Sequence, residues 1–216
     1  MPGPPESEDV AIDGPAGRLE ALYECPQEAA PRASVVVCHP HPQYGGTLRN
    51  KVVHTLARAF VRQDCAALRF NFRGVGKSEG AWDEGQGEQA DAEAAVEWLR
   101  RRLPGIPLWL AGFSFGAAIA IRVAASAEPA GLVTVAPAVR RFAAGLESQP
   151  DCPWLVVQGD ADELVDVAET IDWVNGLAPG PELVVMPGVD HFFHGRLVEL
   201  RATVSAFLGD YLPPPP

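Results

Sequence analysis

A serine stands between two glycines in Gly112-Phe113-Ser114-Phe115-Gly116, a spacing that suits a nucleophile. The apolar run 108–111 precedes it and an alanine-rich run follows, which predicts a strand, a tight turn and a helix. In such a turn the serine Oγ projects from the end of the strand, and glycine fits at both flanks because side chains there would collide with neighbouring backbone. A serine before a helix can also serve as an N-cap. A nucleophile therefore needs further support from a base, an acid and oxyanion donors.

Candidates for the base and the acid follow the serine along the chain. A serine hydroxyl becomes nucleophilic at neutral pH when a base takes its proton, and a carboxylate fixes the tautomer of that base. His191 and His194 are the candidate bases, after the apolar run 182–186. Asp160 and Asp162 are the candidate acids, after another apolar run. The order Ser114, Asp162, His191 is one that serine hydrolases use.

Apolar runs of strand length alternate with segments of helical periodicity along the chain. A hairpin is expected over 10–12 and 19–24, with helices at 50–63, 88–103, 114–127, 165–177 and 196–212. Further strands are expected at 34–38, 66–72, 107–113, 131–136, 154–158 and 182–186. This alternation predicts an α/β fold with a mostly parallel sheet of about eight strands and helices on both faces. Open sheets of this kind carry their sites at the carboxyl ends of the strands, where the candidates above fall.

Five motifs in this order resemble the α/β-hydrolase superfamily, and in particular its small bacterial members without a lid. They extend over the chain from about residue 10 to 210. The motifs are 39–46 (His-Pro-His-Pro-Gln-Tyr-Gly-Gly), 68–78 (Leu-Arg-Phe-Asn-Phe-Arg-Gly-Val-Gly-Lys-Ser), 112–116, 159–162 and His191. The resemblance implies a single α/β-hydrolase domain. The stretch 137–153 is long enough for one short helix and leaves no room for a cap domain.

The resemblance also selects among the candidates. The family pattern Gly-x-x-Asp implies Asp162 as the acid, and Asp160 is the alternative, with a capping role in the same turn. The family histidine lies between the last strand and the last helix, which implies His191. His194 is then expected to begin that helix or to line the pocket. Glu163 and Asp166 are expected to be helix-start charges.

The oxyanion hole is expected to use two backbone N–H groups. The residue after the nucleophile, Phe115, supplies one. The loop after strand 34–38 supplies the other, and because proline has no N–H, His41 is the only donor between 40 and 42. The resemblance implies the same position, with Gln43 or Tyr44 as the fallback. The imidazoles of His39 and His41 are interpreted as structural. Metal binding by that pair is disfavoured because no further spaced ligands accompany it.

Two charged motifs are interpreted as structural. Gly76-Lys77-Ser78 ends like a phosphate-binding loop, but that motif requires glycine where this chain has Asn71. In the family this stretch shapes a loop, and Asn71 stands where many members have Asp, so a weaker salt bridge to Arg73 is expected. Glu88 and Asp91 are interpreted as the charged first turn of a helix rather than an acid–base pair.

Composition limits the other classes of function. The 216 residues fit one domain, expected over 10–212 between loose tails at 1–9 and 213–216. The net charge of −11 disfavours nucleic-acid partners. No apolar run has the length of a membrane span, and the N-terminal segment lacks the features of a signal peptide. The four cysteines have no metal-site spacing and are interpreted as reduced thiols of a cytoplasmic protein.

The leading hypothesis is a serine hydrolase that cleaves small carboxylic esters through an acyl-enzyme and needs no cofactor. Without a lid the pocket is expected to be open and shallow. Its apolar lining is expected to include Tyr44, Phe115, Phe142, Phe192 and Phe193. A peptidase or amidase with the same triad and a non-catalytic interaction domain of the same fold are the alternatives. The substrate is expected to be a small-molecule ester and the protein a monomer or a homodimer.

Overall fold

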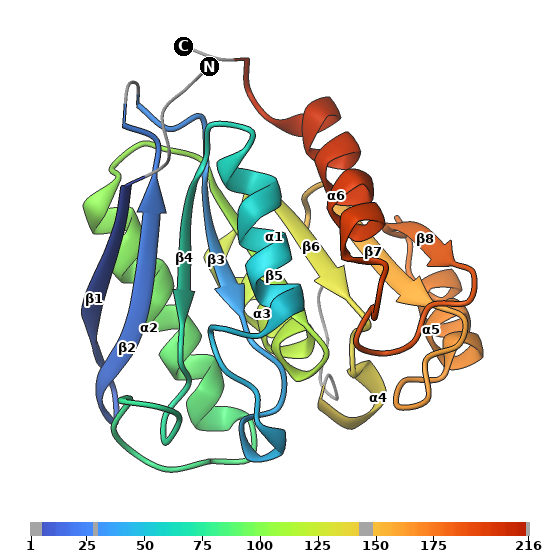
Figure 1. The fold of residues 1–216 in the computed structure, drawn as a ribbon, viewed down its shortest axis with the longest axis horizontal. Coiled ribbons are helices and arrows are strands. Elements are labelled where there is room, and N and C mark those ends of the chain that lie inside the picture. The colour runs from blue at the N-terminus through green and yellow to red at the C-terminus, as the bar shows by residue number, and fades with distance from the viewer. Residues whose placement is uncertain (1–5, 28–29, 143–148, 215–216) are drawn as a thin grey trace.

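The computed structural model describes residues 6–27, 30–142 and 149–214. One eight-stranded sheet runs through the molecule in the order β1-β2-β4-β3-β5-β6-β7-β8 (Figure 1). The strands are β1 (Glu6–Gly14), β2 (Gly17–Cys25), β3 (Ser34–Cys38), β4 (Ala66–Phe70), β5 (Leu108–Phe113), β6 (Gly131–Val135), β7 (Trp154–Gly159) and β8 (Glu182–Met186). β1 and β2 form an antiparallel hairpin, and β2 is antiparallel to β4. The other neighbouring strands pair in parallel, so their carboxyl ends meet at one edge of the sheet.

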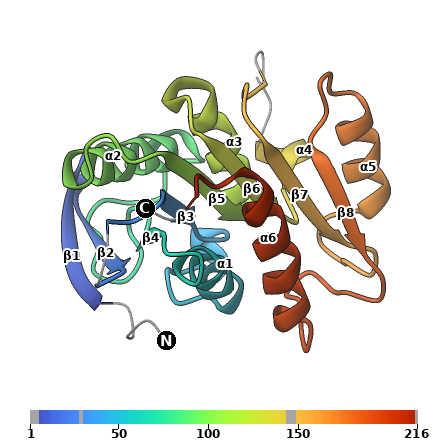
Figure 2. The same ribbon diagram turned by 90° about the horizontal axis from the view of Figure 1, so that it is seen from above.

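Helices cover both faces of the sheet (Figure 2). α1 (Lys51–Val61) and α6 (Leu197–Tyr211) pack on one face. α2 (Gln86–Arg102), α3 (Phe115–Ala127) and α5 (Val167–Asn175) pack on the other. The short α4 (Val139–Phe142) and the 3-10 turn η1 (Pro42–Tyr44) lie in loops that follow the carboxyl ends of β6 and β3.

Two apolar cores explain why the central strands are almost continuously hydrophobic. Side chains alternate along a strand, so Val35 and Val37 enter the core under α1 and α6. Val36 and Cys38 enter the core under α2 and α3. Both sets are fully buried, as expected for parallel strands covered on both faces. The strand ends are therefore held rigidly, which gives the loops that follow them fixed positions.

The predicted fold class is confirmed, and each predicted strand and helix is present. The N-terminal boundary was wrong: β1 begins at Glu6 rather than at Val10, so residues 6–9 pair with β2 instead of forming a tail. Residues 1–5 of that predicted tail lie outside the described residues. At the other end, Pro213 accepts a hydrogen bond from Arg32 Nε at 2.7 Å. Within the described residues, no helix has the length and apolarity to cross a membrane.

The loop after β4 is held by a buried ion pair that differs from the prediction. Arg73 donates from Nε and Nη2 to the two oxygens of Asp91, at 3.0 and 2.8 Å, and the Asp91 side chain is fully buried. Asp91 is therefore the partner of Arg73 rather than a solvated helix-start charge. Glu88 is buried too and accepts hydrogen bonds from the backbone N–H groups that precede α2. Asn71 instead binds Glu20 and the N–H of Leu48.

Candidate active site

Ser114 lies in a strained turn between β5 and α3. Its backbone has φ 56° and ψ −116°, a positive-φ conformation outside the left-handed helical region that non-glycine residues rarely adopt. A Cβ on Gly112 would overlap the carbonyl oxygen of Gly116, and a Cβ on Gly116 would overlap the carbonyl oxygen of Cys38. Both glycines are therefore required by the close approach of backbone to backbone, as the motif predicts. The turn brings the Ser114 hydroxyl to the carboxyl end of the sheet.

Ser114, His191 and Asp162 form one hydrogen-bonded chain. His191 Nε2 lies 3.1 Å from Ser114 Oγ, and His191 Nδ1 lies 2.8 Å from Asp162 Oδ2. The His191 side chain is 3% exposed and the Asp162 side chain is fully buried. The carboxylate cannot donate, so with Asp162 ionised Nδ1 carries the proton and Nε2 is left to accept from the serine hydroxyl. The three residues follow the carboxyl ends of β5, β7 and β8, which lie at the same edge of the sheet, with β6 between β5 and β7.

The Asp162 carboxylate has partners at both oxygens. Oδ1 accepts from the N–H groups of Leu164 and Val165 at 2.8 and 2.7 Å. Oδ2 accepts from Gln158 Nε2 at 3.0 Å in addition to His191. Gln158 is fully buried near the end of β7 and was not among the predicted site residues. A polar residue inside an otherwise apolar strand was the available signal.

These hydrogen bonds keep Asp162 ionised. Burial alone would raise its pKa, but the hydrogen bonds from His191 and from the Val165 and Leu164 N–H groups outweigh burial and hold the pKa below its usual value. The arrangement thus has a hydroxyl, a base that can take its proton, and a buried anion that orients the base and stabilises its protonated form.

Phe115 and His41, the two predicted oxyanion donors, line the same cavity as Ser114. Phe115 is the first residue of α3, so its N–H has no acceptor within the helix. His41 precedes η1 and lines the same cavity as Ser114 and Phe115. The loop that carries His41 is anchored by His39, whose Nδ1 lies 2.6 Å from the Pro40 carbonyl oxygen and whose Nε2 accepts from Phe72 N at 3.1 Å. Burial lowers the pKa of His39 to about 4, so the ring is neutral at pH 7.

Known proteins resemble this chain in both sequence and structure. Residues 29–148 match the model of a family described as serine aminopeptidase, S33. The structure is similar to that of XC6422 from Xanthomonas campestris, described as an α/β serine hydrolase without a lid, with TM-score 0.93, 42% identity and full coverage of both chains. The chain is a member of the α/β-hydrolase superfamily.

Two further relatives cover most of this α/β hydrolase. An α/β serine hydrolase homologue from Coxiella burnetii has TM-score 0.88 and 45% identity, over 93% of this chain and 97% of that one. A protein of Rickettsia prowazekii described as uncharacterized is 34% identical over 210 residues, which are 92% of this chain and 87% of that one. The similarity therefore extends well beyond the motifs around Ser114.

Other predicted residues of this α/β hydrolase lie near the site in supporting positions. Asp160 accepts from the Gly188 N–H at 2.6 Å and ties the loops after β7 and β8 together. Asp166 caps α5, as predicted for a helix-start charge. Glu163 was misinterpreted, because its carboxylate accepts from the His191 N–H at 3.3 Å instead of starting a helix. His194 neither begins α6 nor lines the cavity; it is exposed and pairs with Asp190.

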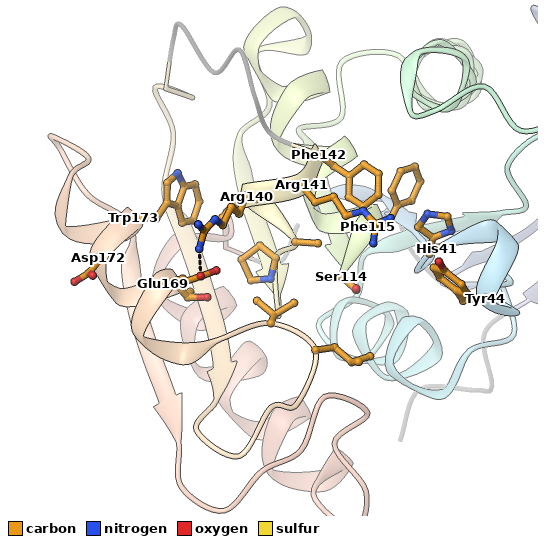
Figure 3. A pocket seen from close by; sticks show the side chains of 16 residues that line it. His41, Tyr44, Ser114, Phe115, Arg140, Arg141, Phe142, Glu169, Asp172 and Trp173 are labelled. Carbon is orange, nitrogen blue, oxygen red and sulfur yellow. Dashed lines mark hydrogen bonds and ion pairs between the residues drawn. The ribbon is translucent and has the colours of Figure 1, made fainter.

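A cavity of about 1030 Å³ opens beside Ser114 (Figure 3). Its volume is at the upper end of the range for small-molecule sites. The predicted lining residues Tyr44, Phe115 and Phe142 do line it. Phe193 does not, because its side chain is fully buried in the core under α6. Phe192 is 42% exposed and lies outside the lining.

α4 and α5 supply charged cavity walls that were not predicted from the sequence. Arg140 of α4 forms an ion pair with Glu169 of α5, while Arg141, Asp172 and Trp173 also line the cavity. In Figure 3 Arg140 turns toward Glu169, whereas Arg141 turns toward the aromatic side chains. Within the described residues, no group of three or more His, Cys, Asp or Glu side chains is arranged to hold a metal ion.

Proposed function

We propose that this α/β hydrolase cleaves carboxylic esters through an acyl-enzyme at Ser114. His191 takes the hydroxyl proton as Ser114 Oγ bonds to the acyl carbon, and the ionised Asp162 stabilises the imidazolium. The N–H groups of Phe115 and His41 bind the oxyanion of the tetrahedral intermediate. The C–O bond to the alcohol breaks, and His191 returns the proton to the leaving oxygen. Water then attacks the acyl-enzyme by the same steps and releases the acid.

The observation that carries the proposal is the hydrogen-bonded chain from Ser114 through His191 to Asp162. The 3.1 Å between Ser114 Oγ and His191 Nε2 is short enough for the base to take the proton of the nucleophile. The 2.8 Å between His191 Nδ1 and Asp162 Oδ2 is short enough for the acid to orient the base. The strained serine backbone adds support, since such strain persists at sites where the surrounding structure enforces it. The low pKa of Asp162 fits the role of a permanent anion beside the base.

Hydrolysis of 4-nitrophenyl acetate tests the proposal. Wild-type protein is expected to release 4-nitrophenolate in proportion to enzyme concentration, and Ser114→Ala is expected to lose at least about a thousandfold in kcat. Ser126→Ala is a matched control, because Ser126 lies at the far end of α3. Equal rates for wild type and Ser114→Ala would refute the proposal.

A peptidase is the second candidate, because the matching family model is described as a serine aminopeptidase. The carboxylate of Asp172 in the cavity wall would suit a protonated amino group. A panel of amino-acid 4-nitroanilides and the corresponding 4-nitrophenyl esters separates the two. An esterase is expected to turn over only the esters at a useful rate, while cleavage of the anilides with comparable kcat/KM would favour the peptidase.

A further inference from the structure

One end of the cavity is built from aromatic rings that surround the His41 imidazole. The ring centroids of Tyr44, Phe115 and Phe142 lie 4.6, 5.2 and 5.5 Å from that of His41. The ring centroid of Trp82 lies 4.5 Å from that of His41. Three of these rings line the cavity together with His41. This end therefore offers flat apolar surfaces to a planar group in the substrate.

His41 also offers a hydrogen-bond donor there. Its Nδ1 lies 3.2 Å from the backbone nitrogen of Gln43, which can only donate. Nδ1 must therefore accept, and the neutral ring carries its proton on Nε2. Burial lowers the pKa of His41, and the charge of Arg141 lowers it further, which favours the neutral ring. Within the described residues, Nε2 has no protein acceptor.

Arg141 brings a positive charge to the same end. Its guanidinium carbon lies 5.5 Å from the centre of the Phe142 ring, and Phe142 is the ring that also contacts His41. Arg140, its neighbour on α4, is neutralised by Glu169. Among residues 6–27, 30–142 and 149–214, no carboxylate pairs with Arg141. In a chain with net charge −11, an arginine at the cavity wall without such a partner is a candidate for binding an anion.

We propose that the substrate is an ester with a carboxylate on a planar apolar body, and that this carboxylate binds the Arg141 guanidinium and the His41 Nε2–H. The proposal rests on the esterase function above and adds its substrate class. The planar body lies against the rings of Phe115 and Phe142, while the ester reaches Ser114. Arginine binds a carboxylate through a planar fork of donors, and the imidazole N–H adds a third hydrogen bond.

Two substrates that differ in one group test the proposal: 4-acetoxybenzoate and its neutral analogue 4-acetoxybenzamide. After correction for their uncatalysed hydrolysis rates, wild-type kcat/KM is expected to be roughly tenfold higher for the carboxylate. Arg141→Gln is expected to bring the ratio close to one, and Arg141→Lys to keep part of it, because lysine retains the charge and loses the fork. Added salt is expected to lower the wild-type ratio because Arg141 is an exposed residue.

Arg101→Gln, on the exposed last turn of α2, is the control for the same change in net charge and is expected to leave the ratio unchanged. Equal kcat/KM for the two substrates, or a preference that survives Arg141→Gln, would overturn the proposal. Binding of benzoate and benzamide to Ser114→Ala, measured by calorimetry, keeps this test separate from the esterase function. If wild type hydrolyses neither ester but Ser114→Ala still binds benzoate more tightly than benzamide, only the esterase function is refuted. If Ser114→Ala binds benzoate and benzamide equally, the carboxylate site is refuted.

Discussion

Protonation of His39 is expected to destabilise the protein between pH 6.5 and about pH 4. The ring is fully buried, and with Nε2 accepting from the Phe72 N–H, the neutral ring donates from Nδ1 to Pro40. Protonation of Nε2 would point its new N–H at the Phe72 N–H and remove the acceptor of that hydrogen bond. Burial accordingly lowers the pKa of His39 to about 4, although the hydrogen bond to Pro40 opposes the shift. The histidine of the unfolded chain has a pKa of about 6.5.

The sign and size of the effect follow from these two values. Below pH 6.5 the His39 ring binds a proton in the unfolded chain but stays neutral in the folded protein, so the free energy of unfolding falls as the pH falls. From pH 8 to pH 5 the loss from this one group is about 2 kcal/mol, and it levels off near 3 kcal/mol below pH 4. The contribution is fully present above pH 6.5.

Urea unfolding followed by tryptophan fluorescence measures the effect. Between pH 8 and pH 5, the free energy of unfolding is expected to fall by about 2 kcal/mol more in wild type than in His39→Asn. If His39→Asn does not fold, NMR titration of the wild-type protein measures the pKa of the His39 ring directly. A ring that titrates near pH 6.5, or equal pH slopes in the two proteins, would refute the reasoning.

Three substitutions test other contacts. Asp91→Ala is expected to cost about 3 kcal/mol of stability in thermal melts, because Arg73 loses its buried partner and keeps only the longer, 3.8 Å contact with the exposed Asp83; a loss under 1 kcal/mol would contradict this. Gly116→Ala is expected to abolish esterase activity, since its Cβ overlaps main-chain oxygen atoms; wild-type kcat would show that the turn can relax. Gln158→Met is expected to lower kcat about tenfold with little change in KM, because Asp162 loses a donor; an unchanged kcat would exclude a positioning role.

The residue pattern predicted the fold and the candidates at the strand ends, and the family resemblance selected Asp162 and His191 among them. Apolar strands that alternate with amphipathic helices leave few topologies other than a covered parallel sheet. That sheet brings the loops after β5, β7 and β8 to one edge. Reactive residues at those three strand ends therefore had to lie close together. The glycines flanking Ser114 were a local signal with a steric cause.

The cavity could not be predicted in the same way. Its charged walls come from α4, between β6 and β7, and α5, between β7 and β8. How these two helices pack depends on contacts between residues distant in sequence. The partner of Arg73 is likewise 18 residues away and on a helix. Phe192 and Phe193 are adjacent and chemically identical. The Phe193 side chain is fully buried whereas Phe192 is 42% exposed, and no residue pattern specifies which of the two enters the core.

Covalent labelling with a fluorophosphonate tests the central claim most directly, because the reagent phosphonylates a serine that its own base has activated. Intact mass spectrometry and peptide mapping are expected to find one label per chain, on Ser114. The label is expected to be absent in Ser114→Ala and formed much more slowly in His191→Ala. Folded wild-type protein that takes no label, or takes it on another residue, would contradict Ser114 as the nucleophile.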